Sequence, residues 1–213
     1  RQLTETFPNL PAWIGKGAGG STIHWAGVSL RFQPHEFRMH SEVGDLPGAN
    51  LLDWPISYAE LEPYYVQAER HMGVTGESSG MPLHDWNNNF KVLAEGASRI
   101  GYRQLRAGPM AINTRPYDGR ASCMQAGFCM QGCRFGAKWS TMYTDIPRAE
   151  ATGLCEIRPN AMALRIEHND AGRVNAVVYA DGDGNLQRQR ARAVCVAGNS
   201  IESPRLLLNS HSS

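Results

Sequence analysis

A glycine-rich stretch near the start of the chain, residues 15–27 (GKGAGGSTIHWAG), has the residue types of a ligand-binding loop. Glycine accepts positive φ angles and lets the main chain approach a ligand closely. The hydroxyls, the imidazole and the indole that follow can hydrogen-bond to a ligand or stack on it. This mixture favours a loop that closes over a flat cofactor with polar edges. An ordinary glycine-rich surface loop is the alternative.

Within this glycine loop (residues 15–27), Gly15, Gly17 and Gly20 match the G-x-G-x-x-G spacing of a dinucleotide-binding turn. Such a turn needs a buried strand before it and a helix after it. Pro8 and Pro11 precede the glycines, and no helical periodicity follows them. We therefore do not assign the fingerprint to this stretch.

Three of the five cysteines form a second group, with the spacing C-x5-C-x3-C: Cys123, Cys129 and Cys133. Glycines between them let the loop wrap tightly, so three thiolates can converge on one metal centre. Zinc would need a fourth ligand, and no Cys or His of familiar spacing is nearby. A loop that binds no metal is the other interpretation. Cys155 and Cys195 are expected to be small buried hydrophobic residues.

The composition excludes some partners. The 213 residues fit one domain or two small ones, and the net charge of +1 gives no indication of nucleic acid binding. No apolar run reaches the roughly 20 residues that span a bilayer, and no signal peptide is recognised.

Apolar spacing and capping residues predict three helices, over residues 57–72, 89–100 and 139–151. Ser57 and Glu60 form a capping box at the start of the first, and Pro63 is expected to interrupt it. The rest of residues 1–50 is expected to be loop, apart from a short strand over 28–32.

The last third of the chain predicts short strands, over residues 155–158, 162–168, 174–179 and 186–190. Turn residues at 169–172 and 181–184 separate the last three. Residues 193–197 (AVCVA) are apolar on both faces, which is typical of a central parallel strand, and Ser203 with Pro204 indicates the start of a helix. A central strand needs parallel neighbours that the chain does not offer, so we expect an internal piece of a larger α/β protein, α+β as a fragment.

Four segments together resemble the glucose–methanol–choline (GMC) oxidoreductases: residues 19–27 (GGSTIHWAG), 53–65 (DWPISYAELEPYY), 132–141 (GCRFGAKWST) and 196–210 (VAGNSIESPRLLLNS). The resemblance implies part of an FAD-binding domain of the glutathione-reductase type, with a β-meander, and part of a substrate domain. It also implies oxidation of an alcohol by hydride transfer to flavin. Residues 1–52 would cover FAD, 53–152 would lead toward the substrate domain, and 153–213 would hold the meander and the last strand and helix of the FAD-binding domain.

The resemblance also implies the cofactor contacts, which are Gly19, Gly20, Ser21, Thr22, His24, Trp25 and Ala163. His24 resembles the histidine that carries flavin covalently in sugar- and polyol-oxidising branches, and a histidine that only hydrogen-bonds is the alternative. The family's dinucleotide turn is expected before Arg1, and its catalytic His, with a His or Asn partner, after Ser213. The fragment alone is therefore expected to be inactive.

In the sugar and gluconate dehydrogenase branch, a similar cysteine loop is associated with a three-iron (3Fe-4S) cluster. The resemblance thus implies a sugar, polyol or aldonate dehydrogenase with a small subunit and a c-type cytochrome, at the periplasmic membrane face. Sterol-oxidase-like relatives carry such loops without a known cluster, so an oxygen-using alcohol or sterol oxidase is the alternative. A non-catalytic metal-binding module is the alternative from another class.

Overall fold

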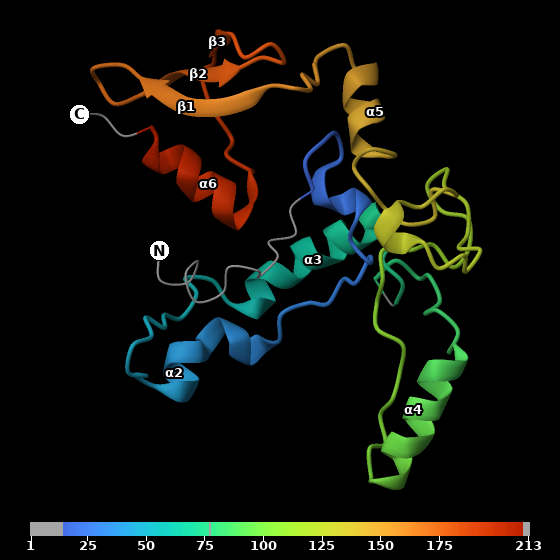
Figure 1. Ribbon diagram of the computed structural model, residues 1–213. Helices are drawn as coiled ribbons and strands as arrows, with labels where there is room; N and C mark the ends of the chain where they lie inside the picture. Colours follow the sequence, from blue (N-terminus) through green and yellow to red (C-terminus); the bar gives the residue numbers. More distant parts are fainter. Residues whose placement is uncertain (1–14, 77, 211–213) are drawn as a thin grey trace, which may run out of the picture. The chain divides into compact units, whose positions relative to one another are not determined.

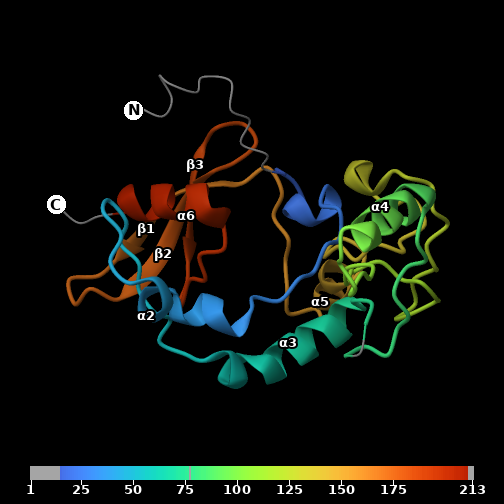
Figure 2. The same ribbon diagram turned by 90° about the horizontal axis from the view of Figure 1, so that it is seen from below.

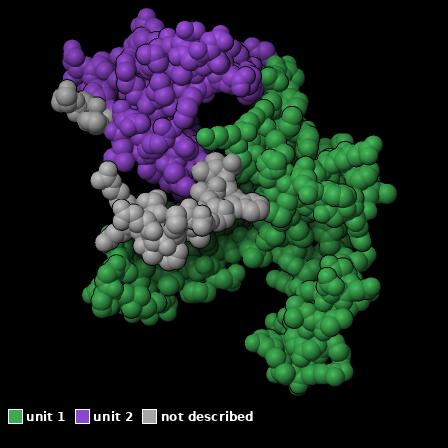
Figure 3. All heavy atoms as spheres, in the orientation of Figure 1, with its two compact units in different colours: residues 1–152 green, residues 153–213 purple. Residues whose placement is uncertain are grey.

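A computed structural model describes residues 15–76 and 78–210. The chain divides into two compact units, residues 1–152 and 153–213, which Figure 3 shows in different colours. The first unit contains the helices, with much irregular chain between them, and the second a three-stranded antiparallel sheet and one helix. This mixture of helices and sheet is consistent with an α/β class. In the described residues, no helix is long and apolar enough to cross a membrane.

The helices of the first unit are η1 (Gly20–Ile23), η2 (Pro34–Arg38), α2 (Met39–Val43), α3 (Tyr58–Met72), α4 (Asn88–Arg99), η3 (Cys129–Gln131) and α5 (Asp145–Ala151), where η marks a 3-10 helix (Figure 1). The predicted capping box of α3 is confirmed. Ser57 Oγ accepts from the Glu60 amide at 3.2 Å, and the Glu60 carboxylate accepts from the Ser57 amide at 2.8 Å. The expected interruption at Pro63 is wrong, since α3 runs through it. A proline removes only its own N–H from the helical ladder, and the flanking turns continue.

The second predicted helix is also confirmed, as α4. The Asn87 side chain caps it by accepting from the Phe90 amide at 2.9 Å. Its apolar side chains are not buried as the spacing suggested, because Val92, Leu93 and Ile100 are all more than half exposed. The third, α5, begins at Asp145, six residues later than expected.

Three distant segments form the centre of the first unit. The Ala111 amide donates to the Gly27 carbonyl at 2.7 Å, and the Trp139 amide donates to the Ala111 carbonyl at 2.8 Å. Ala111 is fully buried, and Val74 and Trp139 pack around it. The strand expected over residues 28–32 is reduced to one bridge, between Val28 and Met110. We define the cysteine loop as residues 123–133. The end of the glycine loop is thus linked, through Ala111, to the chain that follows the cysteine loop.

In the second unit, the strands β1 (Met162–His168), β2 (Val174–Ala180) and β3 (Leu186–Arg190) form an antiparallel meander in sequence order, as predicted. The Asn169 and Asp181 side chains accept main-chain amides inside the two turns. The helix α6 (Asn199–Leu208) contacts β1, and Figures 1 and 2 show it covering one face of the sheet.

Several expectations for the second unit are wrong. Residues 155–158 and 193–197 form no strand, because no partner strand lies beside them in the described chain. Cys155 and Cys195 are consequently exposed and not buried. The helix α6 begins at Asn199, four residues before Ser203, and Pro204 lies inside it. The Asn199 side chain accepts the amides of the first turn, which supplies the earlier start.

Candidate functional site

The glycine loop contains a tight turn. The Gly20 amide donates to the Gly17 carbonyl at 3.0 Å, and η1 follows directly. Gly17, Gly19 and Gly20 have φ angles of 143°, 89° and 53°, which L-residues with a side chain rarely adopt. The glycines therefore let the chain turn where other residues would be strained.

The glycines of this turn face different surroundings. A Cβ on Gly19 would lie 2.9 Å from Met142 Cβ, so this glycine packs inward. A Cβ on Gly17 or Gly20 would meet nothing within 4 Å among the described residues. One side of the turn is thus packed, and the other presents bare main chain.

Thr22 and Trp25 belong to the packed side. Thr22 Oγ1 donates to the Gly19 carbonyl at 2.5 Å and lies 3.2 Å from Ser140 Oγ. Trp25 Nε1 donates to the Trp139 carbonyl at 3.0 Å, and the two indoles meet edge to face with centroids 6.1 Å apart. These polar groups are engaged inside the protein, so they stabilise the loop.

Ser21 and His24 lie on the exposed side. His24 Nδ1 lies 3.0 Å from the Met130 carbonyl, in the cysteine loop. A carbonyl oxygen only accepts, so this contact requires the proton on Nδ1. In the neutral ring Nε2 then carries the lone pair, and it is the nitrogen available to a ligand.

Lys138 lies beneath both loops and is fully buried. Its Nζ donates to the carbonyls of Ile23 and Trp25, both at 2.7 Å, and to that of Cys129 at 2.6 Å. Burial lowers the pKa of Lys138, and the nearby Cys129 and Cys133 thiols oppose that effect. With its three donors engaged, this side chain fixes loops and does not bind a phosphate.

The three cysteines of the cysteine loop are partly buried and reduced. Burial raises the pKa of Cys129, and the charges of Cys123 and Cys133 raise it further. The thiols are therefore near one another, yet no three His, Cys, Asp or Glu side chains in residues 15–76 and 78–210 are arranged to hold one metal ion. The iron–sulfur interpretation therefore stays a prediction from sequence.

Ala163 lies in the second unit, on β1, where it pairs with Tyr179 of β2. The pairing register shifts directly after it, between Ala163 and Arg165. Such irregularities free main-chain groups from a ladder and often lie next to binding sites. The structure leaves the expected contact of Ala163 with adenine as a prediction.

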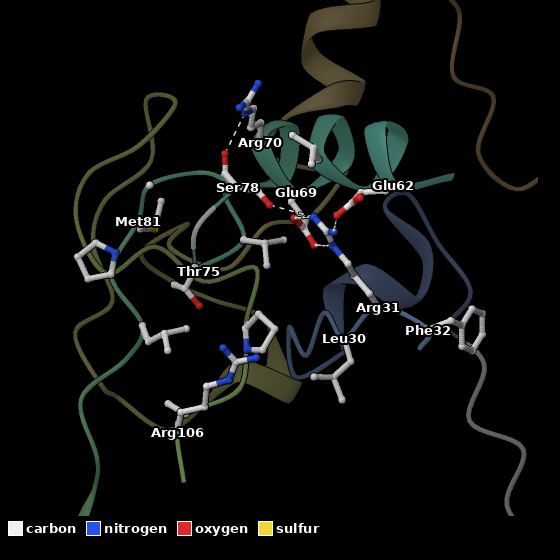
Figure 4. A pocket seen from close by; sticks show the side chains of 18 of the residues that line it. Leu30, Arg31, Phe32, Glu62, Glu69, Arg70, Thr75, Ser78, Met81 and Arg106 are labelled. Carbon is white, nitrogen blue, oxygen red and sulfur yellow. Dashed lines mark hydrogen bonds and ion pairs between the residues drawn. The ribbon is translucent and has the colours of Figure 1, made fainter. Parts of the chain in front are cut away.

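The sequence analysis missed a pocket of about 880 Å³ in the first unit (Figure 4). Arg31 Nε and Nη2 donate to the two carboxylate oxygens of Glu69, both at 2.7 Å. Its remaining donors reach Tyr58, Glu62 and Ser78. The Arg31 guanidinium is not available to bind a ligand, because its donors are engaged in these contacts. It instead links the chain after the glycine loop to α3. No motif marks this pair, because Arg31 and Glu69 are far apart in sequence.

Comparison with known proteins identifies the family of this chain. The family model for GMC oxidoreductases matches residues 8–212. The fructose dehydrogenase large subunit of Gluconobacter japonicus is 36% identical over 208 residues, covering 92% of this chain and 37% of that protein.

Two further relatives show a similar range. The 6'''-hydroxyparomomycin C oxidase of Streptomyces lividus is 34% identical, over 93% of this chain and 38% of that protein. The gluconate 2-dehydrogenase flavoprotein of Pantoea cypripedii is 27% identical, over 98% of this chain and 39% of that protein. The chain spans less than two fifths of the length of these curated relatives. Because the family model covers nearly the whole chain, the chain belongs to the GMC oxidoreductase family.

Proposed function

We propose that this chain supplies the FAD-covering loop of an oxidoreductase that oxidises a CH–OH group of a sugar, polyol or aldonate. The observation that carries the proposal is the glycine loop, which is packed on one side and presents bare main chain at Gly17 and Gly20 on the other. Relatives named for fructose, gluconate and an aminoglycoside support a polyhydroxylated substrate.

The residues present fit FAD. A flat ring system needs close main-chain approach, which the open side of Gly20 gives, and polar groups at its edge, which Ser21 and His24 give. Gly19, Thr22 and Trp25 would act indirectly, by holding the loop in shape. We extend this proposal to an FAD-binding domain of the glutathione-reductase type, in which the Ala163 main chain meets the adenine.

FAD bound there supplies the acceptor for the hydride that leaves the substrate carbon. The chain's own part is to bind and orient the cofactor and to keep water from one side of it. None of the described residues is assigned to take the hydroxyl proton. By family resemblance, a histidine is expected to act as that base.

Replacement of Gly20 by alanine tests the cofactor loop. Gly20→Ala places a methyl group on the open side, and we expect FAD affinity of the complete gene product to fall about tenfold or more, or about 1.4 kcal/mol. Gly48→Ala is the matched control, since Gly48 also has a positive φ, 79°, and an added Cβ there meets no atom within 4 Å in the part of the chain that the structure describes. Equal flavin affinity in the two variants would count against the proposal; it is measured by titration of apoproteins that both also carry His24→Ala, so that flavin stays dissociable.

We also propose that His24 carries the flavin covalently through Nε2. The support is the contact between Nδ1 and the Met130 carbonyl, which in the neutral ring leaves the lone pair on Nε2, together with the exposed position of His24. Acid precipitation of the complete gene product should leave the yellow colour in the pellet. Colour found wholly in the supernatant would leave His24 as a hydrogen-bonding residue only.

For the electron acceptor we propose a c-type cytochrome, served by a small subunit and a 3Fe-4S cluster at Cys123, Cys129 and Cys133. The resemblance of the cysteine loop to that of the sugar and gluconate dehydrogenase branch supports this. Oxygen is the second candidate, because one relative is named an oxidase. Iron and sulfide analysis of the complete gene product, with an assay for peroxide during turnover, distinguishes the two.

A further inference from the structure

Lys138 combines complete burial with an amine that has three main-chain partners. Two of them, the carbonyls of Ile23 and Trp25, belong to the glycine loop, and the third, that of Cys129, belongs to the cysteine loop. The three distances lie between 2.6 and 2.7 Å. One side chain thus joins two loops more than a hundred residues apart in sequence.

The three contacts indicate that the Lys138 amine is in its charged ammonium form. Three carbonyl oxygens can only accept, so three N–H donors are required, and only the ammonium form has them. In the part of the chain that the structure describes, no carboxylate forms an ion pair with Lys138, and the ionisable groups that act on it are the Cys129 and Cys133 side chains. A buried cation without a counter-ion is unfavourable. Its presence is therefore better explained by what it holds in place than by stability alone.

The partners of Lys138 surround His24. The two carbonyls of the glycine loop are those of the residues directly before and after His24. The third precedes Met130, whose carbonyl lies 3.0 Å from His24 Nδ1. His24 and Lys138 consequently form two separate links between the same two loops. His24 cannot move relative to the cysteine loop without breaking one of them.

We propose that Lys138 is a positioning residue that holds the main chain on both sides of His24 and couples it to the cysteine loop. The orientation of His24 toward the flavin then depends on a side chain that does not touch the cofactor. A change in the cysteine loop also reaches the glycine loop through the same ammonium. This inference rests on the proposed function, because His24 is taken to face FAD.

The test uses Lys138→Met in the complete gene product. The methionine fills a similar volume and leaves all three carbonyls without their donor. We expect main-chain hydrogen exchange to rise by about tenfold or more in both residues 19–26 and residues 127–134. We expect FAD binding to weaken by about tenfold or more, with an altered visible circular dichroism of the flavin that remains bound.

Arg120 offers a matched control. It is also a buried cation that donates to main-chain carbonyls, those of Ala137 at 3.1 Å and Met72 at 2.8 Å, and neither belongs to the two loops. Arg120→Met should lower the melting temperature about as much as Lys138→Met, by roughly 5–10 °C. Its flavin affinity and flavin dichroism should stay those of the wild type, because only a positioning role separates the two variants.

The inference is overturned if Lys138→Met raises exchange in only one loop, or if both variants change the flavin equally. Should Lys138→Met fail to fold, Lys138→Gln decides the question, since it keeps two N–H donors without the charge. Lys138→Gln should show smaller changes of the same kind in hydrogen exchange and in flavin binding. Hydrogen exchange equal to that of the wild type in this variant would overturn the inference. If the wild type binds no flavin, the proposed function fails, while the exchange measurement still decides whether Lys138 couples the loops.

Discussion

The two compact units of this chain bury different kinds of side chain. In the described residues, every buried polar or charged side chain lies in the first unit, where Asn113, Arg120 and Lys138 occupy interior positions. In the second unit the buried positions are apolar: Ile166, Ala176 and Val178, all on the sheet. The first unit therefore adds specific polar links between distant segments to its apolar core, whereas the second is held by a pattern of neighbouring strands.

This difference has a consequence for mutation. A buried polar link depends on both partners, so loss of one leaves the other unsatisfied at a cost of about 1–3 kcal/mol. A sheet of apolar contacts loses stability in proportion to the area removed. The first unit should thus be the more sensitive to small changes at interior positions.

The sharpest comparison uses two glycines with the same φ angle of 70°, Gly73 in the first unit and Gly172 in the second. A Cβ on Gly73 would lie 2.9 Å from Tyr117 Cδ1 and 3.0 Å from Arg120 Nη2, whereas one on Gly172 would meet no atom of the described residues within 4 Å. We expect Gly73→Ala to cost about 3 kcal/mol of stability, from strain and overpacking, and Gly172→Ala about 1 kcal/mol, from strain alone. Urea denaturation of both variants measures the difference, and equal losses would contradict the comparison.

The next largest effect concerns the sheet. Val178 on β2 is 5% exposed, and Val178→Ala should cost about 2 kcal/mol through lost burial and the cavity left behind. Val174→Ala, at a position 37% exposed on the same strand, is the control and should cost less than half as much. Similar midpoints of thermal unfolding for the two would show that the sheet face is not the core of the second unit.

A smaller loss of stability is expected at the capping box of α3 in the first unit, which residues close together in the sequence form by themselves. Ser57→Ala removes the side-chain half of the capping box of α3, and should cost about 1 kcal/mol. Ser200→Ala, at an exposed position in the first turn of α6, should change stability by less than about 0.5 kcal/mol. Urea midpoints that coincide for the two would mean that the box does not stabilise α3.

The smallest effect depends on pH. Hydrogen bonds from the Ser41 hydroxyl and amide, with Arg38 nearby, lower the pKa of Asp53 from 3.8 to about 2. The pKa of Asp53 is lower in the folded state than in the unfolded state, so its ionised carboxylate stabilises the fold above about pH 4. This stabilisation is lost as the pH falls toward 2. Asp53→Asn should flatten the acid loss of stability in that window. An unchanged acid profile of the variant, followed by tryptophan fluorescence, would contradict the assignment; all five tryptophans of the chain lie in the first unit.

Local patterns predicted much of the fold. The capping box at Ser57 and the two turns of the meander each depend on residues only a few positions apart. Predictions that needed a distant partner were less successful. Residues 193–197 have the composition of a buried strand but no neighbour beside them in the described chain, so none of them is buried.

The candidate site divides in the same way. The sequence located the glycine loop and its exposed His24, since glycines next to hydroxyl and ring side chains are visible in one stretch. It gave no means to tell that Gly19, Thr22 and Trp25 face inward, because that depends on Met142, Ser140 and Trp139 far along the chain. Nor could it bring the Arg31–Glu69 pair together, as no motif joins them.

The sequence by itself determined the family, the glycine loop, the helices α3 and α4 and the meander, because short-range spacing encodes turns, caps and periodicity. Only the tertiary structure decided that Lys138 is buried between two loops, with an ammonium shared among three carbonyls. Main-chain carbonyls have no residue identity, so a site built from them leaves no trace in the sequence except the lysine itself.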